Sequence, residues 1–259
     1  MLITLITLPT GQSRPVASLT LPAGAWRGSH LAPGVTRMLQ IQQGTGEMAV
    51  TGAFVWHAGR VLCEWQAENF QSIAGKSVLD LGTGTGIVGI YAACIGASRV
   101  LLTDGGTADV LDLASENVEL SRGCYHPGAE VSVARYRWGG LCESAGDADE
   151  HRRLPAALRG PWDYVLAADV TYSQKTHAAL CTTLRCLLEQ AVPPRCLLSH
   201  QHRLGDPPLE AFSDSAAAHG LAVEVLSRVE RVPEGGDQPC RASILELSSR
   251  RESCSVLFF

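Results

Sequence analysis

The stretch DLGTGTG, residues 80–86, decides the fold of this chain. It overlaps the end of the apolar run SVLDLG at residues 77–82, which is typical of a buried strand, and it precedes an apolar segment with helical spacing at residues 87–95. A glycine-rich turn between a strand and a helix presents backbone N–H groups at the carboxyl end of a sheet. Open α/β sheets bind ligands at that edge. The stretch therefore predicts an α/β fold and a ligand site beside the turn.

Strands and helices alternate after this turn. The predicted strands are residues 99–104, 131–138, 164–169 and 195–200, and the predicted helices are residues 108–120, 174–189 and 209–219. Short apolar strands separated by helices indicate a parallel sheet covered on both faces. Two last strands, residues 222–230 and 242–248, flank a turn-rich segment. We expect a doubly wound, Rossmann-like α/β sheet, mostly parallel, with an antiparallel C-terminal hairpin.

The chain before the glycine turn has a different composition. Residues 1–34 are rich in Pro, Gly, Ser and Thr, which predicts an irregular or strand-bearing extension. Residues 38–43 and 48–56 resemble two short strands around a turn at residues 44–46, and helical spacing starts at Val55. We expect an N-terminal arm and hairpin over residues 1–50 and one α/β domain over residues 51–259. The polar segment 142–160 predicts an exposed loop.

Composition narrows the classes of partner. Hydrophobic residues make up 46% of the 259 residues and charged residues 18%, as in a globular protein with a substantial core. The net charge of −5 argues against a nucleic-acid partner. The nine cysteines include no C-x-x-C pair, which indicates buried reduced thiols, and we expect no metal site.

The N-terminus carries no clear targeting signal. The apolar run at residues 2–8 is too short to span a membrane and lacks the basic flank of a signal peptide, so we expect no membrane partner. Residues 1–46 have no acidic residue, as in some organellar transit peptides, but prolines interrupt any amphipathic helix there. We expect a cytoplasmic protein, with organellar targeting as the alternative.

The glycine turn matches two ligand motifs. GTGIVG at residues 84–89 is a G-x-G-x-x-G, the fingerprint of dinucleotide-binding domains. The turn opens earlier, at Gly82, which gives a D-x-G-x-G-x-G that resembles the first motif of class I methyltransferases. Dinucleotide domains commonly begin near their first strand, whereas a long segment precedes this one. Asp104 ends the next strand and can accept hydrogen bonds from a ribose under either interpretation.

Four segments together resemble one family of methyltransferases. They are TGAFVWHAGRVL (51–62), GKSVLDLGTGTGIVGI (75–90), RYRWG (135–139) and WDYVLAADVTY (162–172). In this order they resemble methyltransferase family 16, the non-SET protein-lysine methyltransferases related to those that act on chaperones, valosin-containing protein and elongation factors. The resemblance runs from about residue 38 to the C-terminus. Its most specific part is the D-x-x-Y motif at residues 169–172.

The resemblance implies S-adenosylmethionine as the cofactor and a class I methyltransferase domain over residues 51–259. It implies the following cofactor-binding residues: Trp56 at the border of the cofactor, Gly82, Thr83 and Gly84 beside its methionine portion, Asp104 at the ribose, Trp138 against the adenine and Ala168 near the sulfonium. It implies that Asp169 and Tyr172 are catalytic, where the methyl group meets the target amine. A protein substrate follows, with a chaperone, an AAA ATPase or a translation factor as candidates.

Some features depart from the family or have a simpler explanation. His57 follows Trp56, where the family often has an acidic residue, and neither the N-terminal arm nor residues 142–160 match clearly. Trp56 and Trp138 are each compatible with a core position. Asp169 ends the predicted strand 164–169 and either serves the site or caps the next helix, although Ser173 is better placed to cap.

Alternative functions stay open at the level of sequence. A methyltransferase for a small amine, or for an arginine or histidine side chain, has the same cofactor motif. A non-catalytic S-adenosylmethionine-binding protein and a nicotinamide enzyme are further alternatives, since the glycine turn serves both ligand classes.

Overall fold

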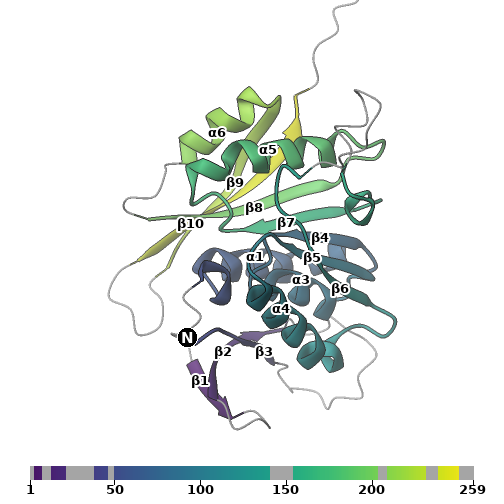
Figure 1. Cartoon of the computed structure of the whole chain (residues 1–259), viewed down its shortest axis with the longest axis vertical. Coiled ribbons are helices and arrows are strands. Elements are labelled where there is room, and N and C mark those ends of the chain that lie inside the picture. Colours follow the sequence, from purple (N-terminus) through teal and green to yellow (C-terminus); the bar gives the residue numbers. More distant parts are fainter. Residues whose placement is uncertain are drawn as a thin grey trace, which may run out of the picture.

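A seven-stranded sheet forms the centre of the computed structural model, which describes residues 3–7, 13–21, 38–45, 50–140, 154–203, 209–231 and 239–250. The strand order is β6-β5-β4-β7-β8-β10-β9 (Figure 1). The strands are β4 (Ser77–Leu81), β5 (Arg99–Asp104), β6 (Glu130–Arg135), β7 (Tyr164–Ala168), β8 (Arg195–His202), β9 (Leu221–Arg231) and β10 (Cys240–Ser249). Strands β4 to β8 pair in parallel, and β10 pairs antiparallel with β8 and β9. The predicted doubly wound sheet with an antiparallel C-terminal hairpin is confirmed.

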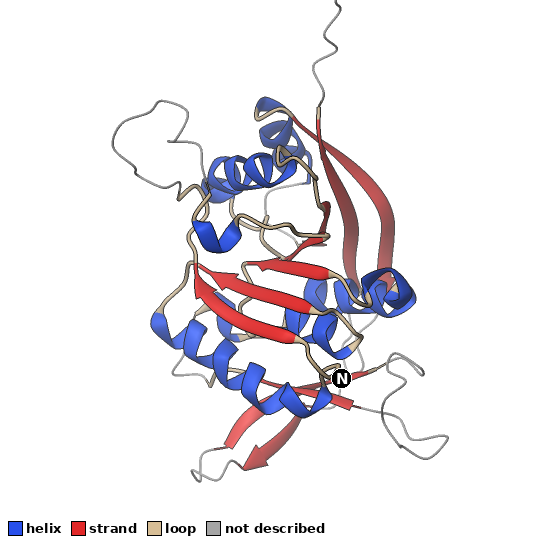
Figure 2. Ribbon diagram, turned by 90° about the vertical axis from the view of Figure 1, so that its right-hand side faces the viewer, coloured by secondary structure: helices blue, strands red, loops and turns tan. Residues whose placement is uncertain are grey.

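Helices cover both faces of the sheet (Figures 1 and 2). One face carries α1 (His57–Glu68), α3 (Ile87–Cys94) and α4 (Ala108–Ser121), and the short α2 (Phe70–Ile73) follows α1. The other face carries α5 (Gln174–Leu188) and α6 (Leu209–Ala218). Strand β4 is buried on both faces: Val78 packs in the core on the α1 side, while Leu79 and Leu81 pack in the core on the α5 side.

A second, three-stranded antiparallel sheet precedes the main one. It consists of β1 (Ile3–Thr7), β2 (Ser13–Thr20) and β3 (Met38–Gln42), in that order. The Tyr91 hydroxyl of α3 donates to the Thr20 carbonyl at 3.0 Å. The Asn117 side chain of α4 accepts from the Gln42 N–H at 2.8 Å and donates to the Gln42 carbonyl at 2.9 Å. The predicted strand-bearing extension is therefore present, and it is joined to the helices beside the glycine turn.

The predicted hairpin of residues 38–43 and 48–56 is wrong. Strand β3 pairs with β2 instead, which lets Leu39 and Ile41 both point into the core. Thr51–Ala53 form the 3-10 helix η1, and residues 46–49 lie outside the described residues. The chain therefore does not continue as a strand after residue 50. At η1 the Gly52 backbone lies directly against Gly84 of the glycine turn.

Two further expectations need correction. The strand predicted at 131–138 ends at Arg135, which pairs with Asp104, the last residue of β5. Trp138 therefore lies in the turn that follows the strand. The segment 142–160 is not wholly exposed, since Leu154 and Leu158 are buried in the core under α5. The 3-10 helix η4 (Ala156–Leu158) places them there, in a connection that has no α-helix among its described residues. Residues 142–153 lie outside the described residues.

The other helices and strands agree with the sequence to within a few residues, including η2 (Arg122–Cys124) as a short extension of α4. Across the described ranges, no helix combines the length and the apolar character that crossing a membrane would need.

Candidate active site

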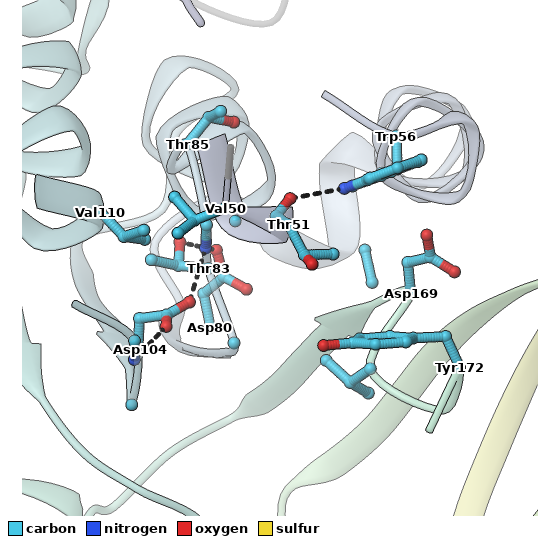
Figure 3. A pocket seen from close by; sticks show the side chains of 18 of the residues that line it. Val50, Thr51, Trp56, Asp80, Thr83, Thr85, Asp104, Val110, Asp169 and Tyr172 are labelled. Atoms are coloured by element: carbon cyan, nitrogen blue, oxygen red, sulfur yellow. Dashed lines mark hydrogen bonds between the residues drawn. The ribbon is translucent and has the colours of Figure 1, made fainter. Parts of the chain in front are cut away.

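A cavity of about 540 Å³ opens at the carboxyl ends of β4, β5 and β7 (Figure 3). Every site residue predicted from the sequence lines it: Trp56, Gly82, Thr83, Gly84, Asp104, Trp138, Ala168, Asp169 and Tyr172. Figure 3 shows Asp104 at one end of the cavity and Asp169 with Tyr172 at the other, with Asp80 and Thr83 between them. The sheet thus brings together residues that are more than 100 positions apart in the chain.

Two glycines of the turn, Gly82 and Gly84, have no space for a side chain. Gly82 has φ +72°, and a Cβ atom there would lie 2.8 Å from both the Trp138 ring and the Val170 side chain. Gly84 has φ +54°, and its Cβ atom would lie 2.8 Å from the Gly52 carbonyl oxygen. Both positions therefore require glycine, for the left-handed backbone and for the close packing. The exposed backbone of this turn is what a ligand in the cavity meets.

Asp104 closes one end of the cavity. Its Oδ2 atom accepts from the Gly84 N–H at 2.9 Å, and its Oδ1 atom accepts from the Gly106 N–H at 2.7 Å. These bonds fix the carboxylate, and each oxygen keeps a second lone pair. Asp104 can therefore still accept hydrogen bonds from two vicinal hydroxyls, which agrees with the predicted ribose contact.

Asp80, at the base of the glycine turn, is a buried acid with one unused oxygen. Its Oδ2 atom accepts from the Thr83 hydroxyl at 2.5 Å and from the Gly89 N–H at 2.9 Å. Its Oδ1 atom has no hydrogen-bond partner among the described residues, and Asp80 lines the cavity. Burial raises the pKa of this carboxyl to about 7, against the two hydrogen bonds, which lower it. A cationic ligand group beside Asp80 would stabilise the ionised carboxylate and offset the cost of its burial.

We expect this proton to make the stability of the ligand-free protein depend on pH. The folded protein holds the proton up to the raised pKa of about 7, whereas the unfolded chain loses it near the ordinary value of 3.8. The stabilisation is therefore full below pH 3.8 and is lost as the pH rises through 7. Between pH 6 and pH 8 the free energy of unfolding should fall by about 1 kcal/mol, measured by urea denaturation.

Asp80→Asn is the matched variant for this prediction. Its carbonyl oxygen can take the place of Oδ2, and its amide takes the place of the unpartnered Oδ1. The fall in stability between pH 6 and pH 8 should shrink by that same amount in the variant. Equal pH slopes in the two proteins would show that Asp80 is already ionised in the folded state.

Trp138 forms part of the cavity wall although it does not lie on a strand. It is half-buried, packs on the core beneath α5 and lies against Gly82. The Gly139 N–H after it donates to the Thr183 hydroxyl at 2.9 Å, which ties this turn to α5. One side of the indole thus packs on protein while the residue lines the cavity, as an adenine platform requires.

Trp138→Ala should weaken binding of S-adenosylhomocysteine by about tenfold, because a stacking surface worth about 1–2 kcal/mol is removed. Trp138→Phe should lose less, since it keeps an aromatic face. Calorimetric titration of both variants measures the effect. An alanine variant that unfolds, together with a phenylalanine variant that binds like wild type, would identify Trp138 as a core residue instead.

Asp169 follows β7 directly and has an uncommon backbone conformation. Its φ of +58° is the one positive value at a non-glycine residue among those described, in a region that aspartate tolerates better than most residues. The Asp169 N–H donates to the Ser199 carbonyl of β8 at 2.9 Å, which holds this bend. Two buried histidines hold the next turn: His200 Nδ1 lies 2.7 Å from the Thr171 hydroxyl, and His177 Nε2 lies 2.9 Å from the Thr171 carbonyl.

The Asp169 carboxylate does not cap α5. It forms a bidentate pair with Arg203, in which Nη1 donates to Oδ1 at 2.9 Å and Nη2 donates to Oδ2. Ser173 is the N-cap residue of α5, but its side chain makes no capping hydrogen bond. The helix-cap explanation is therefore wrong for Asp169, while Ser173 holds the N-cap position as expected, without a side-chain hydrogen bond. Arg203 was not predicted from the sequence. It follows β8, whereas its partner Asp169 follows β7.

Two aromatic side chains flank this carboxylate. Figure 3 shows Asp169 between the rings of Trp56 and Tyr172, which lie 38% and 41% exposed. The Trp56 indole N–H donates to the Thr51 carbonyl at 2.8 Å, so η1 fixes the ring. We call this end of the cavity, formed by Asp169, Trp56 and Tyr172, the entrance; a carboxylate and two aromatic rings can attract a cationic or amine-bearing group.

The residues present fit the cofactor that the resemblance implies. Asp104 can hold a ribose, Trp138 can stack on a base, and the unpartnered oxygen of Asp80 can meet a cationic amino-acid group. Sequence analysis missed the contributions of Thr51, Gly52 and Val110, which line the cavity from η1 and α4. Thr51 and Gly52 lie in the segment 51–62 that carries the resemblance, whereas no motif marks Val110. The described residues contain no cluster of three His, Cys, Asp or Glu side chains that could hold a metal.

Comparison with known proteins agrees with this geometry. Residues 35–212 match the model of a protein family described as lysine methyltransferase. The mouse EEF1A lysine methyltransferase 3 is 35% identical over 149 residues, which cover 58% of this chain and 56% of the mouse protein. The Eremothecium gossypii protein N-terminal and lysine N-methyltransferase EFM7 is 28% identical over 203 residues, or 77% of this chain and 74% of the fungal protein.

Other matches are shorter or structural. The zebrafish protein N-lysine methyltransferase METTL21A is 33% identical over 135 residues, or 52% of this chain and 55% of that protein. The matches to the mouse and zebrafish relatives span little more than half of their length. Among solved structures, a magnesium protoporphyrin IX methyltransferase from Synechocystis with bound SAM aligns with TM-score 0.50 at 16% identity, covering 73% of this chain and 77% of that one. This last likeness shows the fold.

Proposed function

The chain belongs to the family of lysine methyltransferases, and we propose that it transfers a methyl group from S-adenosylmethionine to a lysine side chain of a protein. The observation that carries the proposal is the entrance at Asp169, where a carboxylate lies between two aromatic rings at one end of the cavity. The partly exposed rings of Trp56 and Tyr172 leave this end of the cavity accessible to a side chain of another protein.

S-Adenosylmethionine, when bound, supplies a methyl group that is already activated on a sulfonium centre. Asp104 would hold the ribose and Trp138 the adenine. Gly82, Thr83 and Gly84 would lie beside the methionine portion. Ala168 would lie near the sulfonium, and Trp56 at the border of the cofactor. Asp80 would lie near the amino group, which its unpartnered oxygen can attract.

The chain's own part in the reaction is to bring an uncharged amine to a defined place. A lysine side chain has an ordinary pKa near 10.4, so losing its proton at pH 7 costs about 4–5 kcal/mol. Asp169 would orient the amine by accepting one of its N–H bonds, and Tyr172 with Trp56 would exclude water from the stem. Holding the amine in line with the methyl group supplies most of what this reaction needs.

Lysate labelling tests this function. The purified protein is incubated with a lysate and deuterated-methyl S-adenosylmethionine, and labelled peptides are mapped by tandem mass spectrometry, with Asp169→Asn as the control. We expect label on lysine that the control does not add. Label confined to arginine, histidine or small amines would contradict the proposal and favour a methyltransferase of another acceptor class.

We further propose a translation factor as the substrate class, ahead of chaperones and AAA ATPases. The mouse relative named above is an EEF1A lysine methyltransferase, which supports this order. Cytoplasmic location is proposed with it, since translation factors act there. Label on a chaperone or an AAA ATPase alone would reverse the order without affecting the lysine chemistry.

A further inference from the structure

Arg203 contacts two of the residues that form the entrance, Asp169 and Trp56. It follows β8 directly, and β8 is the neighbour of β7, which leads to Asp169. Besides its bidentate pair with Asp169, its Nη2 donates to Gln201 Oε1 at 2.8 Å. Its guanidinium carbon lies 4.9 Å from the centre of the Trp56 ring. One side chain therefore joins the acid and an aromatic wall of the entrance.

This pair is shielded from water. The Asp169 side chain is 7% exposed and the Arg203 side chain 23%, so solvent screens their interaction less than it does the surface ion pair of Arg231 and Glu64, at 55% and 42%. A bidentate guanidinium satisfies one lone pair on each carboxylate oxygen and offsets the negative charge. Each oxygen keeps a lone pair that can accept from an amine.

The positive charge of Arg203 matters because an unpaired carboxylate would favour the protonated, unreactive form of the acceptor lysine. An unpaired negative charge within 4–6 Å of a lysine stabilises its ammonium, commonly by 1–3 pKa units. The ammonium cannot act as a nucleophile. A carboxylate that is already paired can still orient the amine by hydrogen bonding, but it attracts the ammonium much less.

Other charged and titratable groups near the entrance do not replace Arg203. From α1, His57 and Arg60 approach, and from β9 Arg231 acts on His57. Burial lowers the pKa of His57, as do Arg60, Arg231 and Arg203, against Asp169, which raises it. Tyr172 and Lys175 line the cavity from the α5 side, and Asp80 lines it from β4. The ion pair of Asp169 is with Arg203.

We propose that Arg203 is a positioning residue of this site: it fixes the Asp169 carboxylate and offsets its charge, so that the acceptor lysine is held at Asp169 as the uncharged amine. The inference rests on the proposed function, because it assigns Arg203 a part in presenting the acceptor. It predicts that Asp169 without Arg203 binds a cation more tightly.

Sinefungin provides a direct test that requires no substrate. This analogue of S-adenosylmethionine carries an amine in place of the transferable methyl group, so its ammonium reports on the charge near Asp169. Affinities of sinefungin and S-adenosylhomocysteine are measured by calorimetry at pH 7 for wild type and Arg203→Met. The preference for sinefungin over S-adenosylhomocysteine should rise by at least about tenfold in the variant.

Four variants separate the charge effect from a loss of packing. Arg231→Met removes an arginine from a nearby but exposed pair and should leave the preference unchanged. Arg203→Lys keeps the positive charge but loses the bidentate geometry, so its preference for sinefungin should rise less than that of Arg203→Met. If Arg203→Met does not fold, the comparison is made between Arg203→Lys, which keeps the charge, and Arg203→Gln, which is neutral. Adding Asp169→Asn to Arg203→Met should abolish the gain.

The outcomes distinguish this inference from the proposed function. An unchanged preference in folded Arg203→Met or Arg203→Gln, with S-adenosylhomocysteine still bound, would overturn the role of Arg203 alone. Failure of wild type to bind S-adenosylhomocysteine would overturn the proposed function and this inference with it. With the labelled acceptor protein, the pH profile of methylation by Arg203→Met should move to higher pH by about one unit, and an unshifted profile contradicts the inference.

Discussion

Asp169→Asn is expected to lower turnover at least about 100-fold while cofactor affinity stays within about tenfold of wild type. Asparagine keeps the size of the side chain and tolerates the φ of +58° at this position, so the bend after β7 should survive. It loses the charge that pairs with Arg203 and one of the two oxygens that can orient an amine. The readouts are single-turnover methyl transfer and calorimetric titration with S-adenosylhomocysteine.

Asp163→Asn is the matched control for this variant. Asp163 lies just before the other end of the same strand, where it accepts from the Ser77 N–H at 2.8 Å and pairs with exposed Lys76. Its loss should reduce stability and leave turnover per folded molecule unchanged. Turnover of Asp169→Asn within threefold of wild type would contradict the catalytic role of Asp169.

Asp104→Ala should weaken binding of S-adenosylhomocysteine by about 1.5–3 kcal/mol, or roughly 10- to 150-fold. The variant loses the oxygens that would accept from the ribose, and it releases the N–H groups of Gly84 and Gly106 that Asp104 now fixes. The glycine turn is thereby loosened as well as stripped of its ribose contact. Equilibrium titration measures the change.

Asp109→Ala removes an exposed acid in the first turn of α4 and serves as the control for net charge. It should bind S-adenosylhomocysteine like wild type. If Asp104→Ala and Asp109→Ala lose affinity equally, the effect is one of long-range charge, and the ribose contact assigned to Asp104 is wrong.

The sheet could be predicted because its signals are local. The run at residues 77–82, the glycine turn and the helix after it are contiguous, and each later strand is a short apolar segment between helices. Asp104 and Asp169 could be predicted for a related reason, since parallel strands end at one edge, whereas the other site residues were implied by the resemblance to methyltransferase family 16. Asp104 and Asp169 each follow or end such a strand, so the fold alone brings them to one cavity.

What the sequence did not predict depends on contacts between distant segments. Arg203 pairs with Asp169 across two strands, and the segment HQHR offers no motif that marks its last residue. A neighbouring-strand argument could have found it, because a carboxylate at the end of a buried strand needs a counter-charge. Strand β3 pairs with β2 rather than with the next segment, in which Gly52 lies against Gly84 of the glycine turn.

The central claim is that this cavity binds S-adenosylmethionine rather than a dinucleotide, and calorimetric titration of the purified protein with S-adenosylhomocysteine and with NAD tests it most directly. The account predicts one molecule of S-adenosylhomocysteine bound per chain with a Kd of about micromolar, weakened in Asp104→Ala, and no binding of NAD. Micromolar binding of NAD without binding of S-adenosylhomocysteine would contradict it.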